Sequence, residues 1–127
     1  MLLVKTFLAP SRIHGIGLFA AQRIRAGTVI WRMSPVIDIE LTDADIERLA
    51  EPARVQIGKY TYMDLVRGKR VLCGDDARFF NHDDRPNCHD FPDESGGTTV
   101  AARDIAEGEE LTCDYARLDA EHVPYRK

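Results

Sequence analysis

Apolar and polar residues alternate over several short stretches of the chain, which is the period expected of half-buried β-strands. Turn-forming residues, mainly glycine, proline and aspartate, separate these stretches. The pattern predicts a mainly β domain of short strands with irregular connections. The expected strands lie at residues 4–8, 18–20, 29–33, 36–39, 71–73 and 98–102.

One stretch follows the helical period instead. Its apolar residues recur every three to four positions, Thr42 precedes them as a suitable N-cap, and Pro52 follows as a residue that would end a helix. We therefore expect one short helix at 43–50. The next segment, 54–65, mixes the two periods, so its secondary structure stays open.

Two parts of the chain are similar to each other. The segment AQRIRAGTVI at 21–30 parallels ARDIAEGEEL at 102–111. Each is typical of an apolar strand end, a turn closed by glycine, and a second strand. The sequence therefore predicts two similar corners, which are too few for a solenoid.

Length and composition indicate one domain. A chain of 127 residues with 44% hydrophobic residues can bury roughly two-thirds of its surface without covalent staples. Apolar runs are too short to span a membrane, and no signal-peptide pattern follows Met1. An odd number of cysteines without a CxxC pair is typical of reduced thiols. We expect a single cytoplasmic domain over 1–127 with no membrane contact.

The charge balance narrows the class of partner. The formal net charge is −4 and the pI is about 5.5. A dedicated nucleic-acid binder normally has a basic face, so direct nucleic-acid binding is not expected. An acidic surface is compatible with a lysine-rich or arginine-rich protein partner.

Three segments have an unusual composition. SRIHGIGLF at 11–19 has two glycines that allow a tight turn or close approach to a ligand, although a dinucleotide site would need a third glycine and a helix. GEELTCDY at 108–115 ends in a tyrosine that could be core, a hydrogen-bond donor or catalytic.

The third segment, RFFNHDDRPNCHD at 78–90, concentrates polar side chains after two aromatic residues. This density indicates a bound ligand, a metal or a capped loop, because buried polar groups need partners. The spacing of its potential ligands matches no zinc site, so no metal is expected. A metal-binding regulatory domain remains an alternative.

Taken together, the three segments resemble the SET-domain lysine methyltransferases, over about 5–116. The length resembles the minimal stand-alone type found in bacteria and viruses. The resemblance implies short strands in several small sheets, with the C-terminal motif threaded through a loop as a pseudoknot. It also implies transfer of a methyl group from S-adenosylmethionine to a lysine of a protein or basic peptide.

The resemblance also implies roles for individual residues. Tyr115 would be the catalytic tyrosine at the inner end of the lysine channel, and Tyr60 the second catalytic tyrosine. The channel would be lined by Tyr60, Tyr62 and Cys113. The cofactor would contact Ile13, His14, Gly15, Ile16, Gly17, Arg78, Phe79, Asn81, His82 and Tyr115.

The chemistry requires a neutral amine. Because free lysine has a pKa near 10.4, making it neutral at pH 7 requires roughly 4–5 kcal/mol. Burial in an apolar channel beside a positive sulfonium lowers that pKa. No strong general base is then needed, and none is obvious in the sequence.

The chain also departs from the family pattern. Asp83 and Asp84 stand where many relatives have serine and a zinc-binding cysteine, and no cysteine follows Cys113. The tail at 117–127 could instead close the channel, or a second protomer could do so in a homodimer. A catalytically weak module that binds basic peptide tails is the alternative function.

Overall fold

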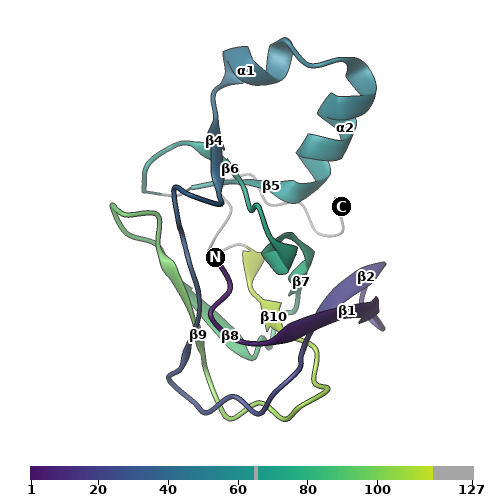
Figure 1. Ribbon diagram of the computed structural model, residues 1–127, viewed down its shortest axis with the longest axis vertical. Coiled ribbons are helices and arrows are strands. Elements are labelled where there is room, and N and C mark those ends of the chain that lie inside the picture. The colour runs from purple at the N-terminus through teal and green to yellow at the C-terminus, as the bar shows by residue number, and fades with distance from the viewer. Residues whose placement is uncertain (65, 116–127) are drawn as a thin grey trace.

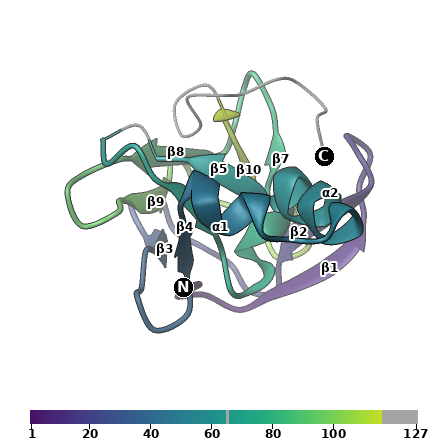
Figure 2. The same ribbon diagram turned by 90° about the horizontal axis from the view of Figure 1, so that it is seen from above.

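The computed structural model describes residues 1–64 and 66–115. Two helices and a three-stranded sheet form one end of the molecule, and the other small sheets form the rest (Figures 1 and 2). The mainly β prediction is confirmed. The strands are β1 Thr6–Pro10, β2 Ile16–Ala20, β3 Val29–Arg32, β4 Ile39–Leu41, β5 Thr61–Met63, β6 Arg70–Leu72, β7 Asn81–His82, β8 Cys88–Phe91, β9 Thr98–Ala101 and β10 Thr112–Cys113.

The strands form four small sheets. Three of them are antiparallel: β1 with β2, β3–β9–β8, and β4–β6–β5. The fourth sheet pairs β7 with β10 in parallel. In this pair Thr112 lies opposite Asn81, and Cys113 lies opposite His82. This parallel pair joins the two motifs that are most distinctive in the sequence. Whether the C-terminal motif is threaded as a pseudoknot stays a prediction.

The helical segment differs in part from the expectation. Helix α1 (Asp43–Glu47) begins at the predicted cap, because the Thr42 side chain accepts a hydrogen bond from the Asp45 N–H and Asp45 caps Thr42 in return. Helix α2 (Glu51–Tyr60) then begins at the position where Pro52 was expected to end a helix. Proline is well tolerated in a first turn, where its missing N–H would have no helical partner.

One strand prediction is wrong. Residues 36–39 were expected to be extended, but Val36 lies in a turn with 90% of its surface exposed, and β4 begins only at Ile39. The Asp38 carboxylate accepts hydrogen bonds from the backbone N–H groups of Ser34, at 2.8 Å, and Gly74, at 3.1 Å. These bonds hold a turn that competes with the strand.

The two similar corners lie against each other. Ile24 and Ile105 exchange backbone hydrogen bonds of 2.9 and 2.7 Å, and both side chains are almost fully buried. The turn glycines, Gly27 and Gly108, have φ values of 83° and 87°, a region that favours glycine. The internal similarity of the sequence therefore corresponds to a pair of equivalent turns that share one part of the core.

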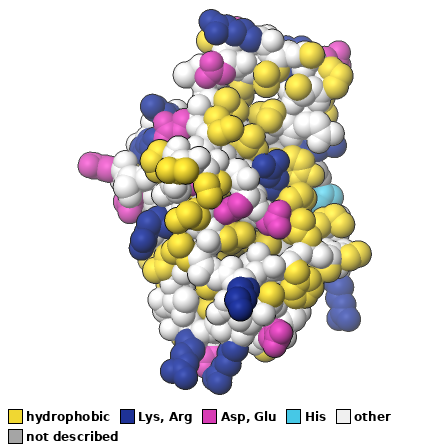
Figure 3. Space-filling view, in the orientation of Figure 1, with side chains coloured by type: hydrophobic (Ala, Val, Ile, Leu, Met, Phe, Trp, Pro, Cys, Tyr) yellow, Lys and Arg dark blue, Asp and Glu magenta, His cyan; other side chains and the backbone are white. Residues whose placement is uncertain are grey.

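The core is made of short strands rather than of helix faces, since neither α1 nor α2 has a buried residue. On the face seen in Figure 3, hydrophobic side chains are interspersed with acidic and basic ones. Within the described ranges no helix has the length and apolar character of a bilayer span. The largest fully buried side chains are Leu18, Ile24, Ile30, Val71, Cys88, Ile105, Leu111 and Cys113.

Candidate functional site

A short loop between β1 and β2 carries the glycine motif, and a serine and a glutamate hold its shape. Ser11 Oγ accepts hydrogen bonds from the backbone N–H groups of Ile13 and His14, at 2.9 and 3.2 Å. The same hydroxyl donates to the carboxylate of Glu110, with distances of 2.8 and 2.9 Å to its two oxygens. A side chain 99 positions away in the sequence therefore fixes this loop.

Asn81 completes the attachment of the loop. Its Nδ2 donates to Glu110 Oε2 at 2.9 Å and to the His14 carbonyl at 3.0 Å, and the residue is only 4% exposed. The Asn81 amide is thus used to join β7 to the glycine loop and to Glu110. We call Ser11, Asn81 and Glu110 the loop clamp.

The two glycines of the motif serve different purposes. Gly15 has a φ of 49°, and a Cβ built there would have no neighbour within 4 Å, so its backbone conformation is what favours glycine. A Cβ on Gly17 would lie 2.5 Å from Glu110 Oε2. Glycine at 17 therefore leaves the space in which the loop clamp forms.

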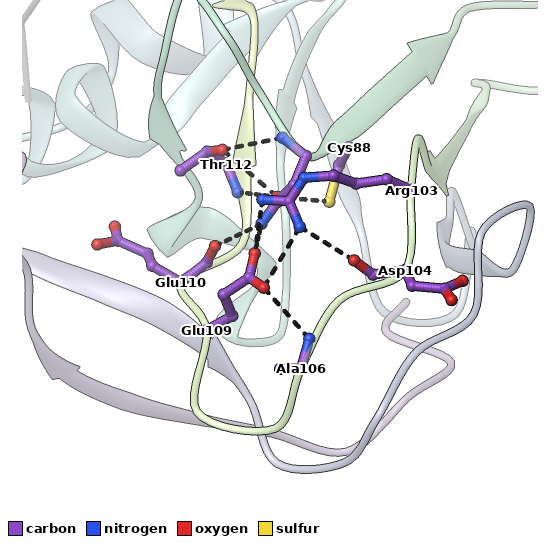
Figure 4. A network of polar contacts seen from close by, with 8 residues as sticks. Cys88, Arg103, Asp104, Ala106, Glu109, Glu110 and Thr112 are labelled. Carbon is purple, nitrogen blue, oxygen red and sulfur yellow. Dashed lines mark hydrogen bonds and ion pairs between the residues drawn. The ribbon is translucent and has the colours of Figure 1, made fainter.

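A second polar network holds the backbone around Glu110 (Figure 4). The Asn87 side chain donates to the Glu110 carbonyl at 2.8 Å and accepts from the Thr112 N–H at 2.9 Å. Glu109 accepts from Arg103 at 2.7 Å, and this hydrogen bond holds the pKa of the Glu109 carboxyl below its usual value. The turn that presents Glu110 is therefore fixed from both sides.

Strand β10 leads to Tyr115, whose backbone and ring lie beside His82. The Tyr115 N–H donates to His82 Nδ1 at 3.1 Å, and the ring centroids are 5.6 Å apart. Because Nδ1 accepts this bond, the network assigns the imidazole proton to Nε2, which lies 2.8 Å from Asp84 Oδ1. The Tyr115 hydroxyl donates to the Phe80 carbonyl.

Two cavities meet between the helical end and the sheets. The first, called here the tyrosine cavity, has a volume of about 60 Å³. The second, called the glycine-loop cavity, has a volume of about 220 Å³ and is lined by His14, Gly15, Ile16, Tyr60, Arg78, Phe79 and Asn81. Tyr60 and Arg78 line both cavities, so the two cavities are neighbours.

Most of the residues predicted from the sequence lie at one of these cavities. Six of the ten cofactor-binding candidates line the glycine-loop cavity, and Tyr115 lines the tyrosine cavity together with Tyr60, Tyr62 and Cys113. The other three candidates, Ile13, Gly17 and His82, are not part of the lining of either cavity. The Ile13 N–H donates to Ser11 Oγ, and His82 Nδ1 accepts from the Tyr115 N–H. The expected lid at 117–127 lies outside the described residues.

The structure adds site residues to which the sequence analysis assigned no role. In the tyrosine cavity these are Trp31, Thr61, Cys73, Ala77, Phe80, Asp90 and Thr99, and around the glycine loop they are Ser11 and Glu110. Three buried polar atoms of this cavity, Trp31 Nε1, Thr61 Oγ1 and the Tyr62 hydroxyl oxygen, have no hydrogen-bond partner in the described part of the chain. Burial raises the pKa of Tyr62 far above its usual value, so its hydroxyl stays protonated.

The chain belongs to the SET domain family. Residues 15–116 match the family described as SET domain. The fold also matches the crystal structure of a candidate histone methyltransferase of Plasmodium falciparum, with a TM-score of 0.63 over 90% of this chain and 95% of that chain. At 18% identity this likeness concerns the fold alone.

Several curated relatives are similar in sequence. Histone-lysine N-methyltransferase 2D of Homo sapiens is 35% identical over 118 residues, which is 86% of this chain. The trithorax histone-lysine N-methyltransferase of Drosophila virilis is 34% identical over 83% of the chain, and ATX2 of Arabidopsis thaliana is 33% identical over 83%. The matched region spans 2%, 3% and 10% of these relatives, respectively.

Proposed function

We propose that this protein transfers a methyl group from S-adenosylmethionine to a lysine side chain of a protein substrate. The observation that carries the proposal is the pair of cavities that share Tyr60 and Arg78. A methyl donor in one cavity and an amine in the other would approach each other beside these shared side chains. Membership of the SET domain family supports this use of the two cavities.

The glycine-loop cavity fits the chemistry of the cofactor. Arg78 supplies a cation for a carboxylate, and the rings of Tyr60 and Phe79, 5.4 Å apart, supply aromatic surface for a base or a sulfonium. Gly15 leaves backbone at the cavity wall without a side chain. When bound, the cofactor supplies a methyl group on a positively charged sulfur.

The tyrosine cavity fits the aliphatic stem and terminal amine of lysine. Tyr115 has its proton committed to the Phe80 carbonyl, so its oxygen is available as an acceptor for an N–H of the amine. Such a bond orients the nitrogen lone pair, and orientation of this kind is worth a large part of a rate acceleration. Apolar groups such as Ala77 and Cys113 lower the polarity around the amine and so favour its neutral form.

The class of substrate follows from charge and from the relatives. The protein has a net charge of −4, and the relatives described above are named for methylation of histone lysines. We propose a lysine-rich protein of basic, histone-like character as the substrate. Electrostatic attraction would raise the rate of encounter with such a partner.

The experiment is a labelling assay with the full chain. Cell lysate and purified histones are incubated with isotopically labelled S-adenosylmethionine, methylated lysines are identified by mass spectrometry, and cofactor binding is measured by calorimetry. Methylated lysine supports the proposal. Cofactor binding without incorporation would favour the alternative of a module that binds basic tails, and the absence of both would refute a methyltransferase.

Tyr115→Phe tests the role of the hydroxyl. Turnover should fall by about 10²-fold, because the amine loses the group that orients it. Cofactor affinity should be preserved, because Tyr115 is not part of the glycine-loop cavity. Tyr62→Phe, which removes from the same cavity a hydroxyl that has no hydrogen-bond partner among the described residues, is the comparison and should have a smaller effect. Equal turnover of Tyr115→Phe and the wild type would remove Tyr115 from the mechanism.

A further inference from the structure

The floor of the tyrosine cavity is a row of side chains across one sheet. Asp90 on β8 pairs with Thr99 on β9, and Thr99 pairs with Trp31 on β3. Side chains at directly opposed positions of neighbouring strands share one face of a sheet. All three residues line the tyrosine cavity, so this face of the sheet forms one wall of it, called here the floor.

This floor is polar although it is buried. Asp90 and Trp31 are each 3% exposed and Thr99 is 4% exposed. Thr99 Oγ1 donates a hydrogen bond of 2.6 Å to Asp90 Oδ1, which fixes the orientation of the carboxylate. Burying a carboxylate is costly unless polar groups solvate it, and this one lines the same cavity as Tyr60, Tyr62 and Tyr115.

Hydrogen-bond donors surround the same space. The indole N–H of Trp31 and the hydroxyls of Thr61 and Tyr62 are buried at this cavity without a partner in the described ranges. Water molecules bind where a cavity offers two to four polar partners and more than roughly 10–15 Å³ of volume. The volume of about 60 Å³ has room for several. A short water chain can therefore connect Asp90 to an amine held at Tyr115.

We propose that Asp90 is the proton acceptor, through this water, for the ammonium group of the incoming lysine. The role deepens the proposed function and rests on it. It also supplies the base that the sequence motifs did not reveal. Asp90 acts through water and not on the reacting atoms, so it sets the protonation state of the amine that Tyr115 orients.

The step is balanced as a proton relay. One N–H bond of the ammonium breaks and its proton passes to water, while that water gives one of its own protons to the Asp90 carboxylate. The nitrogen keeps the electron pair and uses it to form the new N–C bond, and the electrons of the old S–C bond stay on sulfur. The product leaves as a methylammonium ion, and Asp90 returns its proton to solvent.

Other titratable groups lie near Asp90, and the test must distinguish their effects on the rate from that of Asp90. Burial and, to a smaller extent, the charge of Asp90 raise the pKa of the Cys88 thiol on the same strand to about 12. His82 contacts Tyr115 from outside the cavity. These groups are present equally in the wild type and in an Asp90 variant, so the ratio of their rates isolates Asp90. The titratable side chains lining the cavity are Tyr60, Tyr62, Cys73, Arg78, Cys113 and Tyr115.

The test compares the wild type with Asp90→Asn, which has the same shape and keeps an acceptor for Thr99. Single-turnover rates are measured from pH 6.5 to 9.5 at saturating cofactor and lysine peptide. Asp90→Asn should be on the order of 10²-fold slower near pH 7. The deficit should shrink about tenfold for each unit of rising pH, because bulk solvent then removes the proton.

Asp38→Asn is the matched control. Asp38 is also a buried aspartate, 5% exposed, but it lies outside both cavities. This variant should keep the pH profile of the wild type, even if it is less stable. Asp90→Asn with the profile of the wild type, or with a faster rate, would overturn the role of Asp90. A wild type that binds the cofactor but methylates no lysine would instead overturn the proposed function.

A proton count provides a second measurement that does not depend on activity. Binding of the lysine peptide is measured by calorimetry in buffers of different ionisation enthalpy, with an unreactive cofactor analogue present that keeps a positive charge in place of the sulfonium. The wild type should release close to no protons, because Asp90 keeps the one that lysine loses, whereas Asp90→Asn should release about one near pH 7. Release of one proton by the wild type, or of none by both proteins, would overturn the proposal.

Discussion

Gly17→Ala should open the loop clamp, although Gly17 lies outside the lining of both cavities. The added Cβ would lie 2.5 Å from Glu110 Oε2 and 2.8 Å from Glu110 Cδ, so the glutamate side chain must move. Moving it breaks its hydrogen bonds with Ser11 and Asn81. The perturbation is steric, because the φ of Gly17 is not in the positive range that favours glycine.

The magnitude follows from the bonds that are lost. Hydrogen bonds to a charged group contribute about 1.5–3 kcal/mol each, and the Glu110 carboxylate has two side-chain partners. Partial rearrangement of its flexible end recovers some of this, which leaves about 3 kcal/mol of lost stability. For a domain of this size such a loss lowers the Tm by about 10 °C. The loop around Gly15 would lose its fixed shape at the same time.

The assays are thermal unfolding and calorimetric binding of S-adenosylhomocysteine. Gly58→Ala is the control, because Gly58 lies in α2 with open space around it, and its Tm should rise slightly. In the double variant with Glu110→Ala, Gly17→Ala should cost almost nothing further, since the clash is gone. An unchanged Tm and unchanged affinity for Gly17→Ala, or full additivity in the double variant, would refute the loop clamp.

Two further predictions concern ionisable groups away from the cavities. Glu109→Gln should lower the Tm at pH 7 but not at pH 3. Arg103 lowers the pKa of Glu109 in the folded protein, so the stability that this gives is present above the pKa of the unfolded chain and is lost as the pH falls through the pKa of the folded protein. A difference in Tm that does not depend on pH would contradict this. Cys88 should resist iodoacetamide at pH 8 in the native protein and react after unfolding in guanidinium, since burial raises its pKa to about 12 and alkylation needs the thiolate. Mass spectrometry of digested protein reports the modification, and rapid native labelling of Cys88 would contradict the burial.

Local patterns predicted the strands well where side-chain alternation alone decides the structure. They did less well where one polar residue forms long-range bonds. The wrong strand at 36–39 is the clearest case, because Asp38 bonds to Gly74, 36 positions away. Pro52 shows a different limit: proline is compatible with the start of a helix as well as with an end, and the sequence pattern did not distinguish the two.

The motifs located the candidate site, but they did not reveal how it is held. Tyr115, Asn81 and the glycine loop were all recognised as candidates from the sequence. The side chains that fix them, Ser11 and Glu110, are separated by 99 positions and became visible only when the chain was folded. A motif therefore indicates which groups take part in the chemistry, whereas the three-dimensional contacts show which groups keep them in place.

Asp90 shows where a sequence signal existed and was not enough. Residues two apart on a strand share a face, so the buried Cys88 already places the Asp90 side chain toward the interior. An inward aspartate on a strand needs polar partners, and Thr99 on the neighbouring strand donates one hydrogen bond to it. What alternation could not predict is that the same face lines the tyrosine cavity, because the cavity also needs residues of β5 and β10 that are distant in the sequence. Its place in this cavity therefore makes the buried Asp90 carboxylate a candidate base.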